Sequence, residues 1–163
     1  MRGLLDKAIC RAYRLAYLGL RVWWFVRRPA THGTGVALWH EDEILLIHTS
    51  YRHCYALPGG FVRPGEPSEQ AARREVLEEI GVDLSDCELR LGWSGTLRFE
   101  SRQDTTDIWE MTVESPPAWR ITSHEIIWAG WVHPAEALRW RLLPHLAAYL
   151  AQKSADGESV RSV

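Results

Sequence analysis

One helical segment between two glycine-containing turns constrains this chain more than any other part of it. Residues 60–82 read GFVRPGEPSEQAARREVLEEIGV and continue from the turn at residues 58–60. The segment carries Glu75, Glu78 and Glu79, which are spaced so that an α-helix brings all three to one side. Like charges this close repel each other unless a cation or solvent relieves the repulsion. The segment therefore indicates a site for divalent cations.

The oxygen atoms that this segment offers suit magnesium or manganese. Both are hard cations that prefer carboxylate, carbonyl and water oxygens. The three glutamates and the main-chain carbonyl near Gly60 supply that set. An acidic helix face is usually only solvated, so the glycine spacing and the register of Arg74 are what favour a metal site here.

The same stretch resembles the Nudix box, the sequence signature of the Nudix hydrolases. Gly60 is followed after five residues by Glu66, and after seven more by residues 74–82, which read REVLEEIGV. Every defined position of the box is matched, and a looser resemblance in the order of strands and helices covers about residues 33–150. The resemblance implies an α+β fold, an α/β/α sandwich in which a mixed β-sheet lies between helices.

The resemblance also implies an activity and a cofactor. Nudix hydrolases cleave the diphosphate linkage of a nucleoside diphosphate joined to another group, by attack of a metal-activated water on phosphorus. The cofactor would be Mg²⁺ or Mn²⁺, and the partner a small nucleotide-like diphosphate. The metal ligands that the resemblance implies are Gly60, Glu75, Glu78 and Glu79.

Catalytic roles follow from the same resemblance, and the set that it implies is Glu75, Glu78, Arg74 and Glu125. Glu75 would orient or deprotonate the water as well as bind metal. Family members differ in which carboxylate is the base, and Glu125 is the best candidate outside the box. Arg74 is expected to hold Glu66 and Glu75 in position, which makes Glu66 a structural residue.

Arg52 is the candidate for contacting substrate phosphates, and the alternative is an ordinary surface arginine. Residues 83–115 contain neither proline nor tyrosine, so the subfamily markers for ADP-ribose, dinucleoside polyphosphates or NADH are not evident. Three functions stay open: a hydrolase of nucleotide diphosphates, a non-catalytic nucleotide-binding regulatory module, and a membrane-peripheral hydrolase of a lipid-linked diphosphate. The intact set of acids favours the first.

Length and charge fit one acidic domain with a basic segment at its start. The 163 residues suffice for a single buried core. Residues 1–28 hold seven basic side chains and one acidic one, a net charge of +6; the total is −2, so the remainder carries −8. An acidic body argues against broad nucleic-acid binding. Three cysteines without a CxxC pair favour a reducing cytoplasm.

Residues 4–26 have the periodicity of an amphipathic helix that ends before Pro29. Basic side chains lie opposite its apolar positions, which are Leu5, Ile9, Ala12, Ala16, Leu20 and Trp23. Its uncharged runs are too short for a transmembrane helix. We favour packing of this helix on the domain or in a homodimer. The alternative is contact with an anionic membrane surface, which would make the cytoplasmic protein membrane-peripheral.

The rest of the chain predicts strands before and after a helix at residues 68–80, with Ser68 as its N-cap and Gly81 as its stop. A final helix is expected from His133 to about Leu150, interrupted by Pro144. The expected strands are 33–39, 44–48, 87–92, 95–100, 108–113 and 126–132, and the first two are expected to form a hairpin.

The expected organisation has three parts. A basic amphipathic helix occupies residues 1–30, the Nudix domain residues 31–151, and a flexible polar tail residues 152–163.

Overall fold

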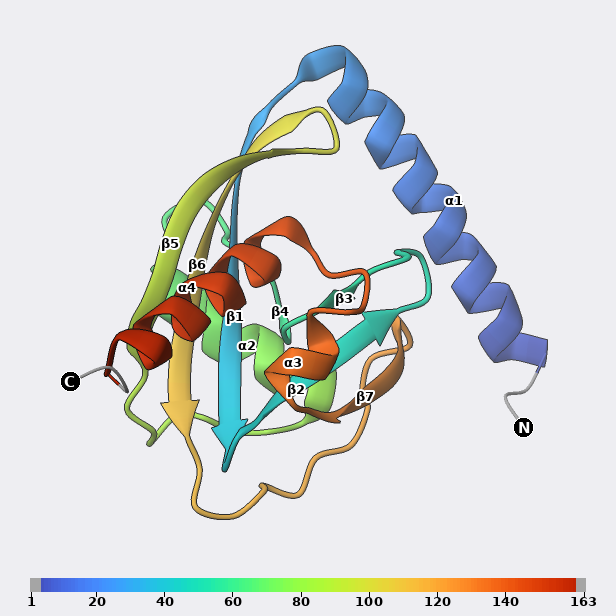
Figure 1. Ribbon diagram of the computed structural model, residues 1–163. Coiled ribbons are helices and arrows are strands. Elements are labelled where there is room, and N and C mark those ends of the chain that lie inside the picture. Colours follow the sequence, from blue (N-terminus) through green and yellow to red (C-terminus); the bar gives the residue numbers. More distant parts are fainter. Residues whose placement is uncertain (1–3, 161–163) are drawn as a thin grey trace.

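The computed structural model, which describes residues 4–160, has a mixed β-sheet with helices on both faces (Figure 1). This is the α/β/α sandwich that the sequence predicts. Its helices are α1 (Leu4–Arg27), α2 (Ser68–Ile80), α3 (Pro134–Ala137) and α4 (Pro144–Val160). Its strands are β1 (Ala30–His40), β2 (Glu43–Thr49), β3 (Tyr55–Ala56), β4 (Gly59–Phe61), β5 (Arg90–Phe99), β6 (Arg102–Thr112) and β7 (Ile126–Val132).

The sheet divides where β1 and β2 separate. These two strands form the expected antiparallel hairpin, but they pair only next to its turn, at Trp39–Ile44 and His40–Glu43. Beyond that point β1 pairs with β4 and, in parallel, with β6, whereas β2 pairs with β3 and β7. Because the two strands diverge, the sheet opens between them, and the short strand β4 lies at this opening.

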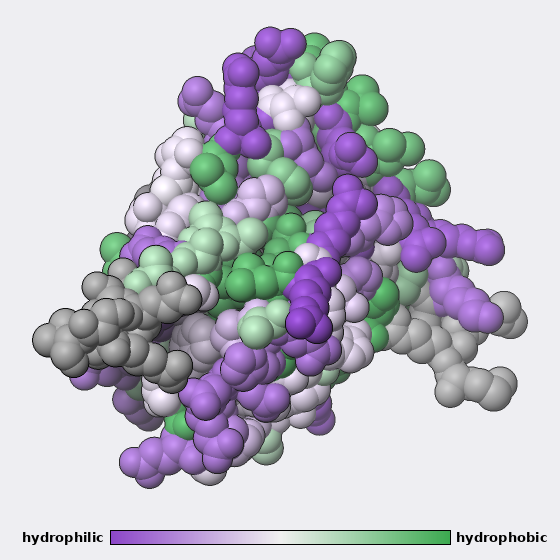
Figure 2. Space-filling model, viewed as in Figure 1, coloured by the Kyte–Doolittle hydropathy of each residue, from purple (hydrophilic) through white to green (hydrophobic). Residues whose placement is uncertain are grey.

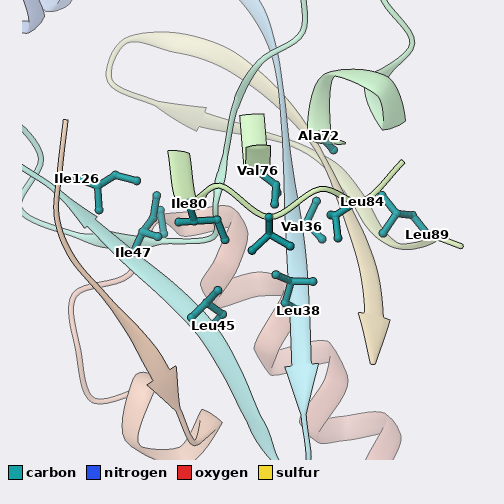
Figure 3. Packing of buried hydrophobic residues seen from close by; sticks show 12 residues of the cluster. Val36, Leu38, Leu45, Ile47, Ala72, Val76, Ile80, Leu84, Leu89 and Ile126 are labelled. Carbon is teal, nitrogen blue, oxygen red and sulfur yellow. The ribbon is translucent and has the colours of Figure 1, made fainter. Parts of the chain in front are cut away.

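Two apolar layers fix the helices to the sheet, one on each face. Side chains alternate along β1 and β2, so that Val36 and Leu38 face α2 while Ala37 faces α4. On the first face they meet Val76 and Ile80 of α2, all with no more than 1% of their surface exposed (Figure 3). Burial of this seam stabilises α2 and sets its rotation about its own axis.

The ends of α2 differ slightly from expectation. Gly81 ends the helix in a left-handed conformation with φ 68°, as predicted, and its N–H donates to the Leu77 carbonyl at 3.1 Å. Ser68 is the first helical residue rather than the N-cap, which is Pro67. The Ser68 hydroxyl instead accepts a hydrogen bond from the Trp109 indole at 3.3 Å. The Ser68 side chain therefore makes a tertiary contact instead of capping the helix.

The predicted strands 87–92 and 95–100 are wrong as separate elements. They form one strand, β5, with a bulge between Leu91 and Trp93. The intervening Gly92 has no side chain, and this lets the Glu110 carboxyl pack against the bulge. The polar end of the chain also differs from expectation, since α4 continues to Val160 instead of fraying at residue 152. The split of the last helix before Pro144 is confirmed.

Helix α1 packs on the domain through a face other than the predicted one. The predicted apolar positions Ala12, Ala16, Leu20 and Trp23 are exposed. The inward face carries Tyr13, Arg14, Tyr17 and Trp24, and Trp24 is only 2% exposed. Leu5 lies where no side chains are described. No helix in the described part of the chain is both long and apolar enough to cross a membrane.

Aromatic and hydrogen-bonding contacts explain this orientation of α1. The Arg102 guanidinium stacks 3.7 Å from the centre of the Trp24 ring. The Tyr17 hydroxyl donates to Glu100 at 2.5 Å, and the Arg14 Nε donates to the Ser50 carbonyl at 2.8 Å. Helix α1 is therefore held by the β5–β6 turn and by the loop after β2, along one edge of the molecule (Figure 1).

Replacing Ile80 by alanine should lower the free energy of unfolding by about 2–4 kcal/mol, because the side chain is fully buried against the sheet. Urea denaturation measures this change. Leu77→Ala on the same helix is the control, since Leu77 is 48% exposed and its loss should cost under about 1 kcal/mol. Equal losses in the two variants would contradict the packing described for α2.

Candidate active site

The glycine loop at β4 lies directly against the acidic face of α2. Gly59 has φ 156°, and a side chain there would collide with the Thr34 carbonyl of β1. At Gly60 a Cβ atom would come within 2.5 Å of the Glu75 carboxyl carbon. Only glycine leaves room for the carboxylate, so Gly60 forms a cradle for Glu75.

Glu79 is bound to the same loop. Its Oε2 accepts a hydrogen bond from the Gly59 N–H at 2.8 Å. Burial, together with the nearby carboxylates of Glu75 and Glu125, raises the pKa of Glu79 to about 8, against the lowering effect of the Gly59 N–H and Arg52. Its negative charge therefore lacks sufficient positive compensation from the protein itself.

Arg74 positions Glu75 through an ion-pair network. Its Nε and Nη2 donate to the two carboxylate oxygens of Glu66 at 2.9 and 3.0 Å, and its Nη1 donates to Glu75 Oε1 at 2.6 Å. The hydrogen bonds from Arg74 lower the pKa of Glu66 to about 2, so Glu66 stays charged and keeps Arg74 in place. Arg74 thus contacts both Glu66 and Glu75, and its positioning role stays a prediction.

Glu78 is the exposed member of the three acids. Its side chain is 54% exposed and lies 3.6 Å from the Arg74 nitrogen that also binds Glu75, and 3.9 Å from Arg63. Because one residue along a helix is a rotation of about 100°, Glu75 and Glu79 can share the loop while Glu78 turns toward solvent. The structure thus brings two of the three acids to the loop and leaves the third beside Arg74.

The donors around the loop suit a hard cation. No group of three or more His, Cys, Asp or Glu side chains within the described residues already stands as a ready ligand cluster. Burial nevertheless raises the pKa of Glu75 as well as that of Glu79, beside the Gly60 cradle. A divalent cation would relieve this accumulation of negative charge, and all the donors in reach are oxygens, as Mg²⁺ and Mn²⁺ prefer.

Glu125 reaches this site from the segment before β7. Its carboxylate accepts a hydrogen bond from the Tyr51 hydroxyl at 2.8 Å, and its carbonyl accepts from the Ser50 N–H at 2.7 Å. Its charge is one of those that raise the pKa of Glu79. The structure therefore brings this downstream acid beside the box, 46 residues beyond Glu79 along the chain.

Arg52 lies at the same place, beside two tyrosine rings that pack on each other with their centres 4.8 Å apart. Its guanidinium carbon is 5.4 Å from the ring centre of Tyr17 and 5.7 Å from that of Tyr51. Its Nε also donates to the Tyr17 hydroxyl at 3.1 Å. Tyr17 belongs to α1, so a residue of the N-terminal helix helps to fix the candidate phosphate-binding side chain.

A cavity of about 100 Å³ lies at the opening between β1 and β2, beside Glu79. Arg52 and the glycine loop line it together with Glu79. Its lining also includes Arg102, Asp104 and His145, the last two joined by a hydrogen bond of 2.8 Å from the His145 ring to the Asp104 carbonyl. The cavity gives a bound molecule room beside the carboxylates.

Sequence reasoning missed several of these residues. Tyr17, Tyr51, Arg102 and His145 stand in no motif, and each reaches the site through a contact distant in sequence. The only available signal was the position of Tyr51 next to Arg52.

The fold and the site together define a class: a mixed-sheet sandwich whose acidic helix packs on a glycine loop, beside a cavity. The sequence profile of the NUDIX domain matches residues 29–153. The chain belongs to the Nudix family.

Curated relatives match over short segments. The chain is 47% identical over 45 residues to an ADP-ribose pyrophosphatase of Methanocaldococcus jannaschii, which is 26% of this chain and 27% of that protein. It is 46% identical over 56 residues to a putative 8-oxo-dGTP diphosphatase of Bacillus subtilis, 34% of this chain and 38% of that one. The chain thus spans about a third of the length of these relatives.

Solved structures match over most of the chain. An Ap4A hydrolase from C. elegans superposes with a TM-score of 0.68 and 22% identity, over 79% of this chain and 98% of that one. A MutT NUDIX hydrolase from Burkholderia pseudomallei gives a TM-score of 0.66 and 25% identity, over 76% and 97%. The likeness establishes the fold.

In the metal-free protein, stability should fall as pH rises from about 4.5 to about 8. The folded state holds the Glu79 proton more tightly than the unfolded state does, so the stabilisation is complete below the ordinary pKa of 4.5 and is lost as pH passes the raised value near 8. Thermal unfolding in chelator across this range measures the slope. Glu79→Gln should flatten it, and an unchanged slope in that variant would contradict the assignment.

Proposed function

We propose that the protein is a divalent-metal-dependent hydrolase that cleaves the diphosphate linkage of a nucleoside diphosphate joined to another moiety. The observation that carries this proposal is the convergence of Glu75 and Glu79 on the Gly59-Gly60 loop, with more negative charge than the protein neutralises. Nudix membership supports the reaction class.

The proposed ligands of Mg²⁺ or Mn²⁺ are the Gly60 carbonyl and the carboxylates of Glu75, Glu78 and Glu79. Such a cation lowers the pKa of bound water and screens the charge of the phosphates. Glu78 is more exposed than Glu75, and its ion pairs with Arg74 and Arg63 are long, at 3.6 and 3.9 Å, so we expect its side chain to turn toward the loop when a cation binds.

The residues of the chain then orient and deprotonate the water. Arg74, anchored by Glu66, keeps the Glu75 carboxylate fixed at the loop. We propose Glu125 as the proton acceptor, because Glu75 already holds an ion pair with Arg74 at 2.6 Å while Glu125 receives only a neutral tyrosine hydroxyl. The water oxygen forms a bond to phosphorus, and the bridging P–O bond breaks toward the leaving phosphate.

Arg52 is the proposed phosphate-binding residue. It lines the cavity beside Glu79, and its hydrogen bond to the Tyr17 hydroxyl and its contacts with the Tyr17 and Tyr51 rings hold the guanidinium in a set direction. The relatives named above differ in substrate, and they include proteins for ADP-ribose, 8-oxo-dGTP and Ap4A. A panel of these compounds with magnesium, scored by release of nucleotide or phosphate, would identify the substrate.

Three unpaired cysteines suit a cytoplasmic enzyme.

Glu79→Gln should reduce turnover by roughly 100-fold or more, because it removes a ligand charge without changing the side-chain shape. Circular dichroism and thermal unfolding would check that the variant is folded. Glu69→Gln is the matched control on the same helix, where Glu69 pairs with Arg73 away from the loop. An unaltered rate in Glu79→Gln would refute the proposed role.

The same measurements test the non-catalytic alternative. A regulatory module would bind nucleotide diphosphates by calorimetry and release no product from any of them, in the wild type as in the variant.

Arg52→Met should raise KM by about tenfold or more while kcat changes little, because a charged hydrogen bond to phosphate is lost and the metal site is left intact. Steady-state kinetics on the best substrate of the panel measures this split. Arg98→Met, at an exposed position of β5, serves as control. A loss confined to kcat would place Arg52 in the chemical step instead.

A further inference from the structure

Helix α1 exposes an apolar surface that its packing on the domain leaves uncovered. Of the thirteen large apolar side chains exposed in the described part of the chain, seven belong to this helix: Leu15, Leu18, Leu20, Val22, Trp23, Phe25 and Val26. Figure 2 shows hydrophobic residues along the outer edge of α1, at the upper right. We call these seven side chains the outer face. Exposed apolar surface gathered on one element is typical of an interaction site.

The outer face cannot turn inward, because the opposite face of α1 is fixed to the domain. Tyr17 bonds to Glu100 and to Arg52, and Trp24 lies buried beneath Arg102. Rotation of the helix would break these contacts and expose Trp24. The domain therefore presents the outer face permanently to its surroundings.

The charges around the outer face are all of one sign. Between residues 7 and 28 the chain has six basic side chains, Lys7, Arg11, Arg14, Arg21, Arg27 and Arg28, and no acidic one. All six are exposed, but Arg14 and Arg21 also contact the domain, through the Ser50 carbonyl and Glu100. Lys7, Arg11, Arg27 and Arg28 are therefore the cations that we assign to the outer face. The remainder of the protein is strongly acidic. An anionic surface would attract the helix and repel the rest of the molecule, which selects a single orientation.

We propose that the outer face of α1 binds the surface of an anionic lipid bilayer. Leucine, valine, tryptophan and phenylalanine side chains would enter the boundary between headgroups and acyl chains, while the flanking arginines meet lipid phosphates. Leu15, Leu18, Val22 and Val26 recur at three- and four-residue steps, so the helix lies flat along the surface. Pairing with the same face of a second copy would instead oppose two basic helices.

Vesicle sedimentation of the full-length protein tests the proposal. The protein should sediment with vesicles of phosphatidylcholine and phosphatidylglycerol, much less with phosphatidylcholine alone, and less as salt is raised. Leu15→Gln combined with Phe25→Gln should weaken binding by about tenfold or more, since two buried apolar side chains are lost. Leu91→Gln combined with Leu138→Gln is the control, at exposed apolar positions outside α1.

Charge provides a second, independent arm. Arg11→Glu combined with Arg27→Glu should abolish the preference for anionic vesicles, and Arg139→Glu on the body should not. Absence of binding to anionic vesicles would overturn the proposal, as would equal losses in the outer-face and control variants. Analytical ultracentrifugation adds a third outcome: a dimer that dissociates in the Leu15→Gln, Phe25→Gln protein would assign the outer face to a second copy and refute membrane binding.

Discussion

The approach of two carboxylates to the backbone of Gly59 and Gly60 is the constraint on which the rest of this structure depends. Buried carboxylates repel each other and lose hydration, so their position must be enforced by the packing around them. Val76 and Ile80 provide that enforcement, because their burial against β1 and β2 fixes the rotation of α2. The apolar seam and the acidic edge of one helix are thus two aspects of a single arrangement, in which core burial offsets electrostatic strain.

The divergence of β1 and β2 gives the site its depth. If the hairpin had stayed paired along its length, the acids would face a closed sheet. Instead β4 attaches to one strand and β7 to the other, and the chain segments that carry Arg52 and Glu125 meet at the resulting opening. The hydrogen bond of Tyr51 to Glu125 joins these two segments, which follow β2 and precede its neighbour β7. The divergence of β1 and β2 therefore determines both the strand pairing and the positions of Arg52 and Glu125.

Local patterns allowed much of this to be predicted from sequence. The bounds of α2, the β1–β2 hairpin, β7 and the break before Pro144 all follow from periodicity, glycine and proline. What failed was non-local: Tyr17 reaches Arg52 across 35 residues and Glu100 across 83. The face of α1 was misjudged for a physical reason, since aromatic rings that stack on arginine, such as Trp24, were buried in preference to aliphatic side chains. Helix spacing alone did not predict the direction of the Glu78 side chain. It placed Glu78 on the same side as Glu75 and Glu79, but only those two carboxylates are fixed at the loop, and Glu78 turns toward solvent.

Helix α1 has a consequence for how this protein is compared with its relatives. The Nudix match begins at residue 29, yet Tyr17 supports Arg52 and Trp24 covers Arg102, two residues of the cavity wall. Two side chains that line the cleft are thus supported by a segment that an alignment of the shared domain leaves out. A ligand preference inferred from that alignment would therefore ignore the contacts that α1 makes with Arg52 and Arg102. A protein shortened to the shared domain would lack these contacts as well as the helix.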